Sequence, residues 1–66
     1  MGGLGGEVRG ATQEEAWKTF DNEIRSQIEE QFGLSLDAPL TREAAFKKMW
    51  RDEKTGFWIL DYHFSK

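Results

Sequence analysis

The chain has 66 residues, no cysteine and a formal net charge of −3. Its length limits it to one small domain, and the missing thiols exclude disulfide bonds and thiolate metal sites. The acidic balance disfavours nonspecific binding to nucleic acid, whereas an aromatic content of 14% supplies large side chains for a core.

The N-terminal segment is rich in glycine. Five of the seven glycines fall within the first eleven residues, and no periodic apolar pattern accompanies them. Because glycine loses more backbone freedom on ordering than any other residue, such a segment favours a mobile chain. We therefore predict a flexible Gly-rich tail over residues 1–11, followed by a single small α+β domain over residues 12–66.

The next segment has the pattern of an amphipathic helix. Thr12 and Glu15 have the spacing of a capping box, in which two side chains satisfy unpaired amides at a helix start. Gly33 stands where a left-handed residue ends many helices. Between them, apolar residues recur at steps of three and four: Trp17, Phe20, Ile24, Ile28 and Phe32. This stripe predicts a helix over residues 12–32, buried along one face.

Residues 34–43 are predicted to connect this helix to the C-terminal third. Pro39 restricts the residue before it to extended conformations, so we expect no helix at Ala38.

The C-terminal third has two interpretations. In the first, residues 52–56 form a turn with Gly56 at a positive φ, and the flanking strands pair with Trp50 opposite Trp58 and Phe46 opposite Tyr62. In the second, a helix starts at Thr41, which gives two helices plus a C-terminal strand. We prefer the hairpin, because a strand over residues 57–64 would otherwise lack a partner. The predicted fold class is α+β, with one N-terminal amphipathic helix packed on a C-terminal β-hairpin.

Little in the sequence points to catalysis. Asp61 and His63 would share a strand face, but no third ligand has metal-site spacing. The paired acidic residues of the helix are adjacent in sequence, so their side chains diverge. We expect no enzyme activity, no cofactor and no metal.

The basic residues gather in the second half of the chain. Residues 1–38 carry eight acidic and three basic side chains, and residues 39–66 carry four and six. A short helix over residues 41–49 followed by a hairpin would resemble part of a winged helix, with the basic stretch 42–54 facing phosphate. A small nucleic-acid-binding protein is therefore our alternative function, although the acidic total makes nucleic acid an unlikely partner.

The leading hypothesis rests on the second face of the hairpin. In the predicted register, Met49, Phe57 and Ile59 point away from the helix, with Lys47 and Arg51 at the rim. Clustered apolar residues flanked by charge often mark an interface. We predict a cytoplasmic protein–protein interaction module, acting as a regulator, inhibitor or subunit without membrane attachment. It would bind another protein or a second copy of itself through the hairpin.

Overall fold

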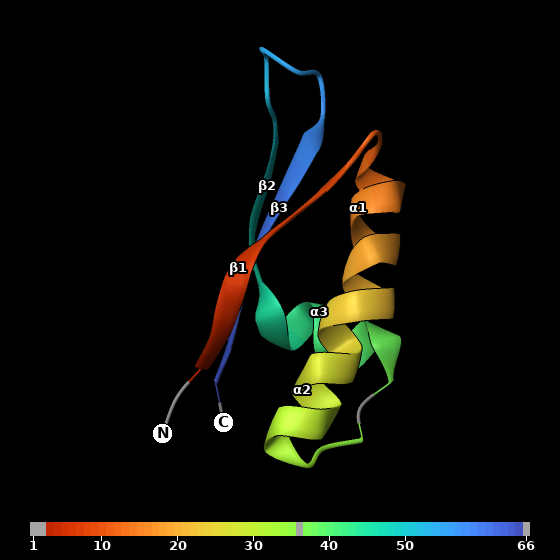
Figure 1. The fold of residues 1–66 in the computed structure, drawn as a ribbon, viewed down its shortest axis with the longest axis vertical. Helices are drawn as coiled ribbons and strands as arrows, with labels where there is room; N and C mark the ends of the chain where they lie inside the picture. Colours follow the sequence, from red (N-terminus) through yellow and green to blue (C-terminus); the bar gives the residue numbers. More distant parts are fainter. Residues whose placement is uncertain (1–2, 36, 66) are drawn as a thin grey trace.

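The computed structural model describes residues 3–35 and 37–65, and it shows a mixed α+β fold (Figure 1). In chain order the elements are β1 (Gly3–Gly10), α1 (Gln13–Thr19), the π-helical segment η1 (Phe20–Ile24), α2 (Arg25–Phe32), α3 (Ala38–Ala45), β2 (Phe46–Arg51) and β3 (Trp58–Ser65). The predicted α+β class is confirmed.

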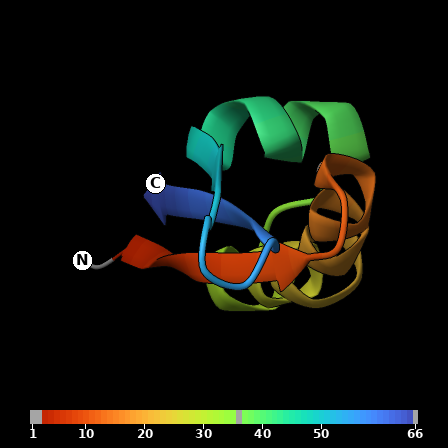
Figure 2. The same ribbon diagram turned by 90° about the horizontal axis from the view of Figure 1, so that it is seen from above.

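The three strands form one antiparallel sheet in the order β1-β3-β2. All the helices lie on the same side of the strands, so one face of the sheet has no helical cover (Figure 1). Seen from above, β1 and α3 lie at opposite margins of the molecule with β3 between them (Figure 2).

The long helix is built as the sequence predicts. The Thr12 hydroxyl accepts a hydrogen bond from the Glu15 amide at 3.1 Å, which confirms the start of the helix. Gly33 ends it with a φ of 67°, a conformation that costs other residues more. The π-helical segment η1 joins α1 to α2 without interrupting the helix, which thus runs continuously from Gln13 to Phe32.

Strand β1 replaces the predicted flexible tail, and that prediction is wrong for Gly3–Gly10; residues 1–2 lie outside the described part. The strand pairs with β3 along its whole length. Its glycines allow close approach of large β3 side chains: a Cβ at Gly5 would lie 2.8 Å from the His63 ring, and one at Gly6 would lie 3.2 Å from the Tyr62 hydroxyl. Aromatic cover of bare backbone in this way stabilises glycine in a strand.

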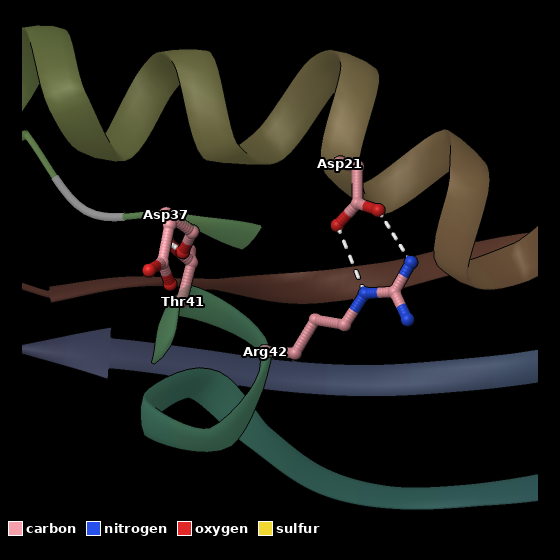
Figure 3. Close-up of polar contacts among 4 residues, drawn as sticks. All are labelled: Asp21, Asp37, Thr41 and Arg42. Atoms are coloured by element: carbon pink, nitrogen blue, oxygen red, sulfur yellow. Dashed lines mark hydrogen bonds and ion pairs between the residues drawn. The ribbon is translucent and has the colours of Figure 1, made fainter. Parts of the chain in front are cut away.

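Helix α3 was not part of the preferred prediction. The Asp37 carboxylate accepts a hydrogen bond from the Leu40 amide at 3.0 Å. The Thr41 hydroxyl donates to the Asp37 carbonyl at 2.8 Å (Figure 3). Pro39 lies in the first turn, where its missing amide hydrogen costs nothing, so the expectation that Ala38 is not helical is wrong. Residues 41–51 thus divide between helix and strand.

The predicted hairpin is present, but in a different register near its turn. The Asp52 amide donates to the Phe57 carbonyl at 2.8 Å, and Gly56 has the expected positive φ of 79°. Because Phe57 belongs to the loop, Trp50 pairs with Ile59 rather than with Trp58. A bulge between Phe46 and Lys48 absorbs this shift, and Phe46 lies opposite Tyr62 as predicted.

The core lies between the long helix and the inner face of the sheet. Phe20 packs edge-to-face on Tyr62, with ring centroids 5.6 Å apart, and Phe32 packs likewise on Phe64. Burial raises the pKa of the Tyr62 phenol. The core comprises Val8, Ala16, Phe20, Ile24, Ile28, Ala45, Leu60, Tyr62 and Phe64. In the predicted pairing, Trp50 and Trp58 would both face the helix, but the shifted register turns Trp50 to the opposite face.

Candidate interaction surface

The face of the sheet turned away from the helices is the candidate functional surface. Side chains alternate along a strand, so the pairing register assigns each residue to a face. We call this surface the outer face, and it carries Glu7 and Arg9 from β1, Ile59, Asp61 and His63 from β3, and Lys48 and Trp50 from β2.

Ile59 is the apolar centre of the outer face. It is only 6% exposed, although it does not belong to the main core cluster. Its cross-strand neighbours are Arg9 on one side and Trp50 on the other. The Lys48 ammonium lies 4.9 Å from the centroid of a Trp50 ring, a cation–π arrangement. Amphipathic side chains of this kind cover apolar surface while keeping their polar ends in water.

Charges of both signs surround this apolar centre. Asp61 has Lys48 opposite it on β2 and Glu7 opposite it on β1. The first pairing is attractive, whereas like charges placed directly opposite destabilise a sheet. The outer face therefore combines a tryptophan, a buried isoleucine and a mixed-charge rim, which is the composition of many protein interfaces.

The structure separates the five residues that the sequence predicted to act together. Ile59 lies on the outer face as expected. Met49 pairs with Leu60 and packs against the core, so its placement beside Ile59 is wrong. Phe57 is 44% exposed but belongs to the loop, and Lys47 and Arg51 are exposed at the bulge and at the end of β2.

Trp50 is the outer-face residue that sequence reasoning missed. The cause is the loop, in which the Asp52 carboxylate accepts hydrogen bonds from the Lys54 amide at 3.0 Å and the Thr55 hydroxyl at 3.1 Å. These bonds, led by the Lys54 amide, lower the pKa of Asp52. An aspartate followed two and three residues later by such donors is a turn signal, and it could have placed Phe57 inside the loop.

A second cluster joins the long helix to α3 (Figure 3). The Arg42 guanidinium donates to both carboxylate oxygens of Asp21, through Nε at 3.1 Å and Nη2 at 2.5 Å. It also lies 5.0 Å from a ring centroid of Trp17, which in turn packs against Phe46. The hydrogen bond that Arg42 donates to Asp21 raises the pKa of Arg42. This bidentate contact holds the two helices together.

Two residues of the basic stretch proposed for nucleic acid contact other side chains of the domain. The Arg42 guanidinium is hydrogen-bonded to Asp21, and the Lys48 ammonium lies over the Trp50 ring on the outer face. Lys47 occupies the bulge between Phe46 and Lys48, where the alternation of side chains along β2 is interrupted. Arg42 and Lys48 are therefore less available to a phosphate backbone than fully solvated cations.

Within residues 3–35 and 37–65, no three histidine or acidic side chains come close enough to hold a metal ion. In the same ranges, no helix has the length and hydrophobicity needed to cross a membrane.

Comparison of the chain with protein-family models, with curated proteins and with solved structures finds no significant match.

Proposed function

We propose that this chain is a small protein-interaction module that binds another protein through its outer face. The observation that carries the proposal is Trp50, which lies beside the buried Ile59 on a sheet face without helical cover. Tryptophan is among the residues that contribute most to binding when a partner excludes water from them. A role as regulator, inhibitor or subunit is compatible with a domain of this size, and a cytoplasmic location stays a prediction.

Charge favours a protein partner over nucleic acid. The outer face mixes Arg9 and Lys48 with Glu7 and Asp61, so it presents no single sign to a polyanion. The chain as a whole carries −3. A mixed rim around an apolar centre is instead suited to a surface that offers complementary charges and an apolar contact.

Affinity capture from the native host, with quantitative mass spectrometry, tests the proposal. Three tagged variants are compared with the parent: Trp50→Ser, Lys48→Glu, and the matched control Leu40→Ser on α3. Leu40 is 53% exposed, so its replacement removes a similar apolar contact from a different surface. Circular dichroism and thermal unfolding establish that each variant is folded.

We expect one protein to be captured by the parent and by Leu40→Ser, and to be lost or strongly reduced with Trp50→Ser. Lys48→Glu, which leaves the core untouched, should weaken capture and change its salt dependence. Equal capture by all four chains would contradict the proposal. Loss of capture by all three variants, each folded, would also contradict it, because binding would not then be specific to the outer face.

A further inference from the structure

Strand β1 has one free edge. It pairs with β3 on one side over Gly3–Gly10, and no described residue pairs with its other side. Such an edge exposes backbone donors and acceptors that another strand can satisfy.

The two edges of the sheet differ in their protection. Strand β2 carries a bulge at its start and the exposed Lys47 and Lys48, which are features that block edge-to-edge pairing. Helix α3 also stands at the margin of the molecule away from β1 (Figure 2). Strand β1 is eight residues long with an unshifted register and no lysine, so it has none of these protections.

The charges of β1 are self-complementary. Glu7 and Arg9 lie on the outer face two residues apart, with Val8 between them pointing to the core. Within the described residues, neither side chain forms an ion pair. Glu7 in addition lies opposite the like charge of Asp61 on β3. A cation that compensates this repulsion can approach from the open side, beyond the edge of β1.

We propose that β1 pairs antiparallel with β1 of a second copy, in a register centred on Val8. Glu7 of each copy then lies opposite Arg9 of the other, and Gly6 lies opposite Gly10. The two sheets become one six-stranded sheet about a two-fold axis, as an isologous interface requires. This self-association does not depend on the proposed function, but it joins two outer faces into one continuous surface.

The register sets the charge order across the joined face. The row that begins with Lys48 and Asp61 continues through Glu7 to Arg9 of the second copy, so both carboxylates are flanked by a cation. Registers shifted by one residue in either direction lose this pairing, because Glu7 or Arg9 would then face a residue on the opposite side of the pleat. A pairing centred on Glu7 would place the two glutamates opposite each other.

Sedimentation equilibrium at low salt tests the proposal with charge-reversal variants. Glu7→Arg and Arg9→Glu each convert both intermolecular pairs from attraction to repulsion, and each should weaken dimerisation roughly tenfold or more. An equimolar mixture of the two variants should recover the affinity of the parent, because every Arg then faces a Glu. Glu7→Arg should also fold normally, since it places a cation opposite Asp61.

Three results would overturn the proposal. The first is a parent chain that sediments as a monomer at concentrations up to about 1 mM, which corresponds to the weakest dissociation constants of specific complexes. The single variants could dimerise as tightly as the parent, which would place the interface elsewhere. The mixture could associate no better than either variant alone, which would exclude the antiparallel register centred on Val8.

Discussion

Replacing Gly10 by alanine tests the close contact between the end of β1 and the start of the long helix. A Cβ at Gly10 would lie 2.4 Å from the Ala16 amide nitrogen and 2.8 Å from the Glu15 carbonyl carbon. Both are backbone atoms inside a helix, so neither can rotate away as a flexible side chain would. The strand and the helix must separate, and overpacking of this kind costs about 1–3 kcal/mol or more.

Gly5→Ala is the matched control from the same strand. Its Cβ would meet mainly the exposed His63 ring, at 2.8 Å, and this side chain can turn aside. Alanine also restricts the unfolded chain, which stabilises by about 0.4–1 kcal/mol where the native conformation is permitted. We therefore expect the two substitutions to change the free energy of unfolding in opposite directions, or at least by different amounts.

Urea unfolding followed by tryptophan fluorescence measures both free energies of unfolding. The structure predicts that Gly10→Ala lowers the midpoint markedly and that Gly5→Ala leaves it nearly unchanged. If residues 3–10 were a flexible tail, neither change would matter. A Gly10→Ala variant as stable as the parent would therefore refute the packing of β1 against the helix.

Three further predictions concern the core, the helix–helix contact and the turn. Ile24→Ala should cost about 2–4 kcal/mol by urea unfolding, whereas Leu40→Ala should stay within about 0.5 kcal/mol; equal effects would show that the helix stripe is not buried. Arg42→Lys keeps the charge but loses the bidentate contact with Asp21, and a half-exposed pair of this kind should lower stability by about 1 kcal/mol. The pKa of Asp52 is lower in the folded chain than in the unfolded one. The ionised carboxylate therefore adds to the free energy of unfolding at pH values above the unfolded pKa, and this contribution is lost as pH falls through the folded pKa. Melting temperatures between about pH 5 and pH 2 should therefore fall less for Asp52→Asn than for the parent, and parallel curves would exclude this role.

The elements with local signals could be predicted from the sequence. The long helix is specified by the capping residue Thr12, the apolar stripe that ends at Phe32 and the terminal Gly33, and each signal acts between residues only a few positions apart. Gly56 similarly marks the turn of the hairpin. Each of these signals acts through neighbours in sequence, so no knowledge of the tertiary structure is required.

Strand β1 could not be predicted in this way, because its stability comes from β3. Gly5 and Gly6 carry no side chain that could reveal a strand, and the rings that cover them, His63 and Tyr62, are more than fifty residues away. Their role appears only when the two segments are paired.

The outer face was mispredicted for a different reason. A loop longer by one residue moves the β2 side chains between the bulge and the loop to the other face of the sheet, which exchanged Trp50 for Met49. Helix α3 begins before the alternative helix expected from Thr41, because proline is favoured in the first turn after a capping residue such as Asp37.

Site-specific photo-cross-linking in the native host tests most directly whether the outer face binds a protein. A photoreactive phenylalanine derivative is placed at position 50, which it suits as another large aromatic group, and separately at the exposed position 40 on α3. Our account predicts a covalent adduct with one distinct protein from position 50 and none with that protein from position 40. No adduct from position 50, or the same adduct with equal yield from both positions, would contradict binding through the outer face.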